Sequence, residues 1–227
     1  MRTVKSPRRA VNSPPAKRAT GGRPLRQPLE TRRRILSAAS LDFAARGLAG
    51  ARVDQIARRA GVSKRMLYHY FGNKEALWLA VLEQAYAHIG GEERLLDVGG
   101  VPPAEGMRRL IAFSVGYCGD HPEFLALLNN ENLHRAKYLR RSKQVRELHT
   151  SLLGVIADLL ARGEREGAFR SGVDPTELYI AIAALGYFYF SNVYTLSTIF
   201  GRDFSEPNAR RRHLDCAVDL IMGFLRP

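Results

Sequence analysis

Apolar residues recur every three to four positions through most of this 227-residue chain, which is the spacing of one face of an α-helix. The first such segment predicts a helix over residues 30–46 that ends at Gly47. Its predicted buried positions are Ile35, Ala38, Ala39, Leu41 and Phe43. Later segments predict helices over residues 104–118, 122–133, 140–167, 174–200 and 207–225. Because no alternating pattern indicates strands, the predicted fold class is all-α.

Residues 52–71 predict two short helices that meet at a tight turn. The apolar side of the first helix is formed by Val53, Ile56, Ala57 and Ala60. Gly61 follows directly, where a helix C-terminus favours a residue that accepts positive φ. Ser63 can cap the second helix, and Leu67 and Phe71 lie one turn apart on its predicted buried side.

The opposite side of that second helix is basic and aromatic. It is formed by Lys64, Arg65, Tyr68 and His69. A helix about 10–12 Å across fits the major groove of B-DNA, which is about 12 Å wide. After a turn at Gly72, Asn73 is a predicted N-cap for a further helix that continues toward Ile89.

The net charge of +13 is unevenly distributed along the chain. Residues 1–29 contain eight basic residues and no acidic one, residues 30–90 have a net charge of +5, and residues 91–227 are neutral. The basic surplus therefore belongs to the N-terminal segments, which indicates a polyanionic partner there.

Three regions are predicted from composition. Residues 1–28 are rich in proline and basic residues and are expected to be a disordered basic arm. Residues 29–89 are the predicted DNA-binding domain, and residues 90–227 are a separate helical domain. Gly90–Gly91 and the glycine- and proline-rich residues 98–103 mark the expected boundary.

Several functions find no support in the sequence. Cys118 and Cys216 provide no disulfide framework, and Cys216 is expected to fill core space. Cys118 and His121 are too few ligands for a metal site, so no metal and no cofactor are expected. Catalytic motifs are missing from the sequence, which argues against an enzyme. Residues 178–200 are predicted to form a buried helix rather than a membrane span. We expect a cytoplasmic protein.

Residues 31–82 closely resemble the DNA-binding domain of the TetR family of transcriptional regulators. The resemblance rests on Thr31-Arg-Arg-Arg-Ile-Leu and on Gly61-Val-Ser-Lys-Arg-Met-Leu-Tyr-His-Tyr-Phe-Gly-Asn-Lys-Glu-Ala-Leu77. It implies a homodimer in which the last two long helices of each subunit form a four-helix interface. It also implies an effector cavity in the C-terminal half, and release of a pseudo-palindromic DNA operator when the effector binds.

The resemblance also implies which residues contact DNA. The reading helix supplies Ser63, Lys64, Arg65, Met66, Tyr68, His69 and Tyr70, and Lys74 contacts phosphate. Arg52 departs from the family pattern, which often has a small hydroxyl cap there, and a nearby phosphate would suit its charge. Arg65 could bind a guanine edge and Met66 a thymine methyl group.

Basic residues before the reading helix offer further contacts. Arg23 and Arg26 resemble the short basic element of arms that lie in A·T-rich minor grooves, although a solvated segment is the simpler interpretation. Arg33, within the run of residues 32–34, is expected to touch phosphates rather than bases.

Aromatic and amide residues of the C-terminal half suggest where the effector binds. The candidates are Phe113, Tyr117, Asn129, Asn132, Tyr187 and Phe190. The same residues could instead form core and dimer interface. The segments 121–125 and 130–136 resemble the family branch that contains repressors of pyrimidine and nicotinic-acid breakdown, which suggests a heterocyclic or aromatic effector. The alternative function is an architectural DNA-binding protein that senses no ligand.

Overall fold

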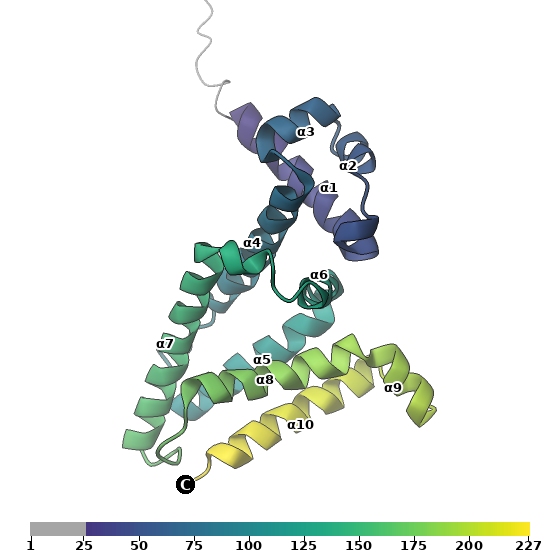
Figure 1. The fold of residues 1–227 in the computed structure, drawn as a ribbon. Helices are drawn as coiled ribbons and strands as arrows, with labels where there is room; N and C mark the ends of the chain where they lie inside the picture. The colour runs from purple at the N-terminus through teal and green to yellow at the C-terminus, as the bar shows by residue number, and fades with distance from the viewer. Residues whose placement is uncertain (1–25) are drawn as a thin grey trace, which may run out of the picture.

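The structure is a computed structural model and describes residues 26–227, apart from the side chain of Arg26. This part of the chain contains α-helices, one short 3₁₀ helix and no strand, as the sequence predicts (Figure 1). The elements are α1 (Arg26–Gly50), α2 (Val53–Arg59), α3 (Lys64–Phe71), α4 (Lys74–Glu93), α5 (Pro103–Asp120), α6 (Pro122–Leu133), η1 (Leu139–Arg141), α7 (Lys143–Arg165), α8 (Pro175–Ser191), α9 (Val193–Phe200) and α10 (Pro207–Leu225).

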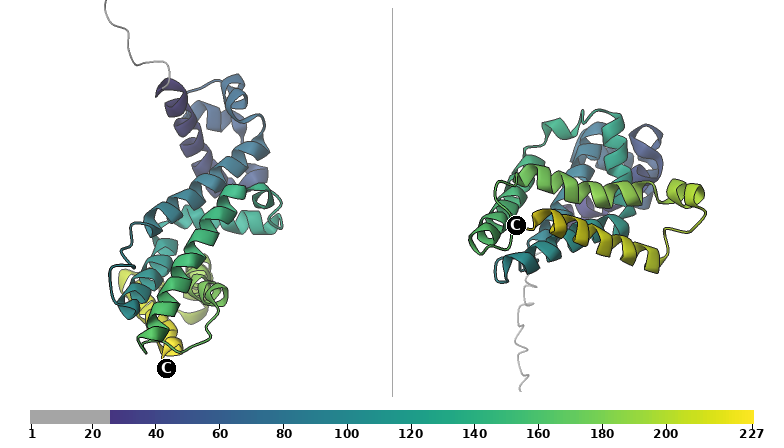
Figure 2. Two further views of the ribbon diagram at one scale, coloured as in Figure 1. Left: turned by 90° about the vertical axis from the view of Figure 1, so that its left-hand side faces the viewer. Right: turned by 90° about the horizontal axis from the view of Figure 1, so that it is seen from below.

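The helices form a small head and a larger body. Helices α1 to α3 lie at one end of the molecule, and α5, α8 and α10 lie at the other (Figure 1). Helix α4 runs from the head into the body, where it packs against α7 (Figure 2). The body and the head therefore share one continuous helix.

The head is built around Trp78, which is fully buried and meets Phe43 edge-on at 5.1 Å between ring centres. Its core also includes Leu127 and Tyr138, which come from α6 and the segment after it. The body has a separate core in which α5, α7, α8 and α10 contribute residues such as Ile111, Leu159 and Ala217. Because Leu127 and Tyr138 belong to the head core, the head packs directly on α6.

The start of α1 differs from the sequence prediction. The helix begins at Arg26, so residues 26–28, which the sequence predicts to belong to the disordered arm, are helical. Pro28 lies in the first turn, where backbone N–H groups have no acceptor within the helix. The N–H that proline lacks therefore costs no helical hydrogen bond. Gly47 leaves the helical conformation at φ 66°, close to the predicted end of the helix. Residues 1–25 lie outside the described part of the chain.

Two residues predicted to be buried are exposed. Leu41 is 55% exposed and faces the cleft between α1, α4 and α6 instead of the head core. Cys216 is exposed because its neighbour Ala217 takes the core-facing position of α10. In both cases the helix was predicted correctly, and the error lies in which face of it is buried.

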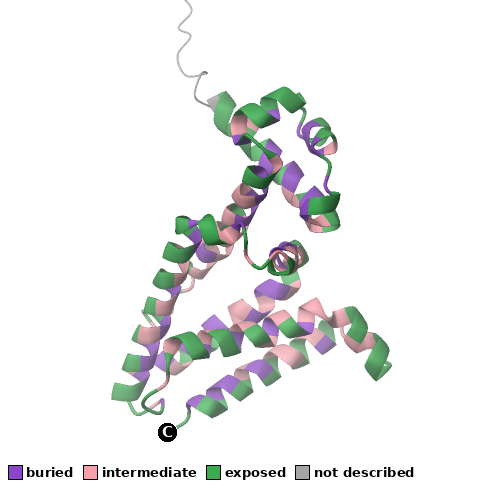
Figure 3. Cartoon of the chain, viewed as in Figure 1, coloured by how far each residue is buried: buried purple, intermediate pink, exposed green. Residues whose placement is uncertain are grey.

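The predicted single helix over residues 174–200 is broken. Helices α8 and α9 meet at Asn192, whose side-chain amide donates to the Phe188 carbonyl at 2.8 Å. This local bond competes with the regular helical ladder. Helix α9 has no buried residue, so this part is not the buried helix that the sequence suggested (Figure 3).

Gly90 and Gly91, placed at the predicted boundary, lie inside α4. Gly90 is buried against α7, and a Cβ atom there would be 3.3 Å from a Leu148 methyl group. The glycine thus serves close helix packing rather than a linker.

Among residues 26–227, no single helix combines the length and apolar composition of a membrane span. Helices α8 and α9 have that composition only as a pair, and the pair is bent by 68°.

Candidate DNA-binding surface and internal cavity

Helices α2 and α3 form the predicted helix–turn–helix. Gly61 adopts φ 65° in the turn between them, as its position at a helix end predicts. The Ser63 hydroxyl accepts a hydrogen bond from the Met66 N–H at 3.1 Å, which confirms the predicted cap. Leu67 and Phe71 are buried in the head core, which also confirms the predicted inner side of α3.

The outer side of α3 is exposed at the end of the molecule remote from the body (Figures 1 and 3). Lys64, Arg65, Met66, Tyr68 and His69 are all exposed there. Tyr70 differs from them, because it is half-buried against the head core and faces Pro28 and Thr31 of α1. The outer side of α3 therefore offers two cations and two aromatic residues to a partner.

Arg52 stands at the N-cap of α2 without a capping side-chain hydrogen bond. Its backbone N–H instead donates to the buried Asp42 carboxylate at 3.0 Å. Asp42 also accepts from Arg46 at 2.7 Å. Asp42 therefore anchors the backbone at the start of α2 from α1, while the Arg52 side chain is exposed.

Two lysines at the edge of this surface have local partners. Lys64 pairs with Asp54 at 3.0 Å, and this exposed hydrogen bond raises the pKa of the lysine above its ordinary value. Lys74 donates to the Ala49 carbonyl at 3.3 Å, which holds its ammonium between the end of α1 and the start of α4. Arg33 is exposed on α1. Arg23 lies outside the described residues, as does the side chain of Arg26.

A buried carboxylate joins the head to the body. Glu131 of α6 is 1% exposed and accepts from the Trp78 indole at 2.7 Å. It also accepts from the backbone N–H groups of Tyr138 and Leu139, each at 2.8 Å. Next to it, the Asn130 side chain accepts from the Leu48 N–H at 3.0 Å. The sequence showed polar residues in this apolar helix but gave no sign that they bind the head.

An internal cavity of about 100 Å³ lies in the body, where α4 to α8 meet. Its wall is mostly apolar and includes Ile89, Phe124, Leu125 and Leu152. The polar residues in the wall include Tyr86, Glu93, His149, Tyr179 and Tyr187. An apolar enclosure with a few polar groups is the usual form of a small-molecule site.

Hydrogen bonds orient several of these polar groups. His149 Nδ1 lies 3.0 Å from the Val145 carbonyl, which can only accept, so this nitrogen donates. In the neutral ring, Nε2 then accepts from the Tyr179 hydroxyl at 3.2 Å. Burial raises the pKa of Glu93 to about 7 and that of Tyr179 to about 12. The Tyr179 hydroxyl is thus a neutral group whose oxygen can still accept a bond from a ligand.

Of the six residues predicted to bind an effector, Tyr187 alone lines this cavity. Tyr187 lies in its wall and donates to the Asn129 side chain. Phe113 and Phe190 pack against the buried cluster that contains Phe124 and Leu125, and Asn132 is exposed on α6. Tyr117 lines a separate cleft on the other side of α4.

Cys118 is in the cavity wall, where burial raises the pKa of its thiol to about 11. Tyr86 and His149 were missed, because only the packing of α4 on α7 brings them together.

Comparisons with known proteins agree with this architecture. Residues 35–81 match the model of the bacterial regulatory proteins of the tetR family, and residues 103–221 match the tetracyclin repressor-like C-terminal domain. The chain is 38% identical to the transcriptional repressor NicS of Pseudomonas putida over 92% of this chain and 98% of that protein.

Two further similarities cover a part of the chain and most of the chain, respectively. The transcriptional regulator RutR of Escherichia coli is 48% identical over 65 residues, which are 29% of this chain and 31% of RutR. The crystal structure of the putative regulator SCO4942 from Streptomyces coelicolor superposes with a TM-score of 0.63 at 25% identity, covering 84% of this chain and 97% of that one. The relatives are DNA-binding regulators and not enzymes. With both halves matched, this chain belongs to the TetR family of transcriptional regulators and is a TetR-type repressor.

Proposed function

We propose that this repressor binds a pseudo-palindromic operator as a homodimer and releases it when a small single-ring effector enters the body. The proposal rests on one observation: a single helix, α4, connects the exposed reading helix to the wall of the internal cavity. Because the chromosome is where such a regulator acts, the proposal places the protein in the cytoplasm.

The DNA contacts follow from exposure and chemistry. Arg65 can bind the O6 and N7 atoms of guanine with two hydrogen bonds, and Met66 can contact a thymine methyl group. Lys74, Arg33 and Arg52 would contact phosphates, which fix the register of the protein on DNA without reading its sequence. The minor-groove contact of Arg23 and Arg26 stays a prediction.

The homodimer is supported by an exposed apolar surface on α8 and α10, which lie side by side (Figures 1 and 2). The α8–α10 surface is defined by Ile180, Phe188, Leu220 and Phe224, which are 47–61% exposed. Several large apolar side chains exposed on two neighbouring helices are typical of a protein interface, and a two-fold pairing of two helices gives a four-helix bundle. Two heads would then lie in successive major grooves, about 34–36 Å apart.

The effector class is suggested by the size and chemistry of the cavity. Its volume of about 100 Å³ is comparable to that of an engineered apolar cavity of about 150 Å³ that takes up benzene. Glu93 can accept a hydrogen bond from a ring N–H, whereas its negative charge opposes a ligand carboxylate when it is ionised. A small aromatic heterocycle with an N–H group therefore fits better than a long acyl chain.

Release of DNA requires that the effector and the operator prefer different orientations of the head relative to the body. A ligand pressed against α4 favours the head orientation that best accommodates it, and DNA favours another. Ligand and operator then weaken each other's binding by the same factor, as linkage requires.

Two measurements test the proposal on the full chain. Selection from a random DNA pool should recover a two-fold-related sequence, and a thermal-shift panel of pyrimidines and pyridines should include a compound that raises the melting temperature. That compound should dissociate the recovered operator complex. Tyr179→Phe should weaken the response to it, and Tyr194→Phe on exposed α9 serves as the matched control. Equal binding to every duplex, with no response to any compound, would favour the architectural alternative.

A further inference from the structure

A cleft of about 370 Å³ separates α1 and α4 from the turn between α5 and α6. It is distinct from the internal cavity and lies on the other side of α4. Two histidines that line this cleft, His88 and His121, lie close to Glu92, and the ligand atoms of the three residues all lie within 4.8 Å of one another. None of them has a part in the proposed DNA or effector binding.

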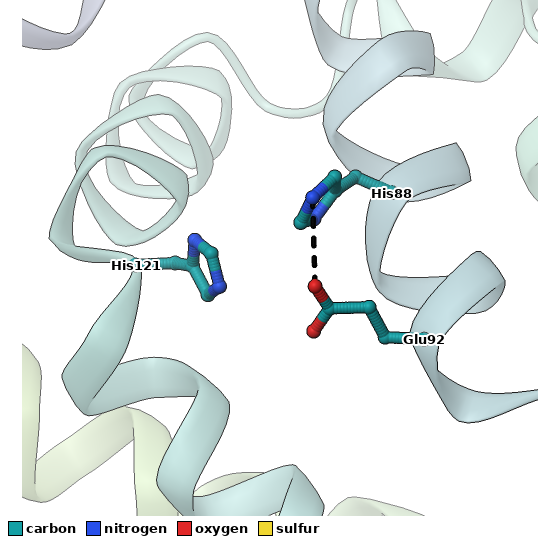
Figure 4. Close-up of side chains that lie close together, drawn as sticks. All are labelled: His88, Glu92 and His121. Carbon is teal, nitrogen blue, oxygen red and sulfur yellow. Dashed lines mark ion pairs between the residues drawn. The ribbon is translucent and has the colours of Figure 1, made fainter. Parts of the chain in front are cut away.

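The three residues come from two separate elements. His88 and Glu92 are one turn apart on α4, and His88 Nε2 lies 3.5 Å from Glu92 Oε1. His121, in the turn between α5 and α6, extends toward this pair from the opposite side (Figure 4). Two ligands bound about 2.1 Å from one tetrahedral ion are about 3.4 Å apart, so the His88–Glu92 spacing already suits a shared ion.

Neighbouring groups orient both histidines for metal binding. His121 Nδ1 lies 3.1 Å from a Glu123 carboxylate oxygen, which can only accept, so Nδ1–H donates and the neutral ring has its lone pair on Nε2. His88 Nδ1 lies 3.0 Å from the Tyr117 hydroxyl, which can accept from it in the same way. The Tyr117 ring also stacks on His121 at 4.1 Å. Metal-binding histidines usually have such a partner on the second nitrogen, which fixes the tautomer and the ring orientation.

We propose that His88, Glu92 and His121 bind one divalent first-row transition-metal ion, with zinc as the ion to test. Two imidazoles and a carboxylate are a ligand set that these ions favour. The three side chains are partly exposed, so water or a small ligand can complete the coordination. Cys118 is not part of the set, because its thiol lies in the wall of the internal cavity.

A bound ion would connect α4 to the α5–α6 turn. Helix α4 leads to the head, and α6 holds the head through Asn130 and Glu131. The ion would thereby restrict the movement of α4 against α6. An effect on DNA rests on the proposed operator binding, whereas metal binding itself does not.

The test uses the full chain, freed of affinity tag and of metal. Calorimetric titration with Zn²⁺ should show one ion per chain, and His88→Gln, Glu92→Gln and His121→Gln should each lower the affinity at least tenfold. His134→Gln, a half-buried histidine outside the cluster, is the matched control and should bind as the wild type does. Circular dichroism without metal should be the same for all variants.

Two further measurements test which side chains bind the ion and whether the ion stabilises the fold. Co²⁺ should give an absorption spectrum without a thiolate charge-transfer band. Zn²⁺ should raise the melting temperature of the wild type but not that of the triple variant. Wild-type binding no tighter than that of the triple variant, or an equal loss in the His134→Gln control, would overturn the assignment. Absence of operator binding would leave the metal result unaffected.

Discussion

The head and the body expose opposite kinds of surface. The outer side of α3 is polar, with Lys64, Arg65 and His69, whereas the α8–α10 surface is apolar, with Phe188 and Leu220 among its members. A charged surface suits a polyanion that remains hydrated and is bound partly through released counterions. An apolar surface of similar exposure is stabilised only when a second apolar surface removes it from water. The contrast supports the proposal that the head binds DNA and the body binds a second copy of the chain.

The strongest disruption should come from a charge in the apolar surface. Leu220→Glu would place a carboxylate in the proposed four-helix interface, and we expect monomers in sedimentation experiments. Loss of the second head should lower affinity for the selected operator by about 10²–10⁴-fold, because the second contact becomes intermolecular. Leu95→Glu, at an exposed leucine outside this surface, is the control. A dimer that persists in the Leu220→Glu variant would place the interface elsewhere.

The junction between the two regions should be nearly as sensitive. Glu131→Ala would leave the Trp78 indole and the backbone N–H groups of Tyr138 and Leu139 without their acceptor. We expect the free energy of unfolding to fall by about 3 kcal/mol or more, measured by urea unfolding at fixed protein concentration. Asn132→Ala changes an exposed position of the same helix and should have little effect. Similar losses in both variants would contradict a specific role of Glu131.

Within the polar surface, base reading and phosphate binding can be separated. Arg65→Ala should weaken binding to the selected operator by about 1–3 kcal/mol and relax the preference at one base position. Lys74→Ala should instead weaken binding to all duplexes alike and reduce the salt dependence by about one counterion. Equal losses on operator and random DNA for Arg65→Ala would reassign that residue to phosphate.

The smallest effect is expected at the cap of α3. Ser63→Ala removes the acceptor for the Met66 N–H and should destabilise α3 by about 1 kcal/mol, visible as faster hydrogen exchange of its amides. Ser171→Ala, at an exposed loop position, is the control. Unchanged exchange in α3 would mean that head packing alone holds its first turn.

The head could be predicted in detail because its signals are local. The Gly61 turn, the Ser63 cap and the buried positions Leu67 and Phe71 each depend on residues a few positions apart. The same local pattern located most helices of the body within a few residues. It was wrong for Leu41 and Cys216, since periodicity shows that a helix has an apolar side but not which neighbour covers it.

The sequence by itself determined the helical class, the helix–turn–helix and the basic character of the N-terminal segments, because helix periodicity, caps and charge are properties of neighbouring residues. Tertiary structure decided the rest. Glu131 reaches Trp78 across 53 positions, His149 meets Tyr86 only through the packing of α4 on α7, and His121 joins His88 and Glu92 across the cleft. Such groups are brought together by burial of apolar faces between distant helices, which no local pattern specifies.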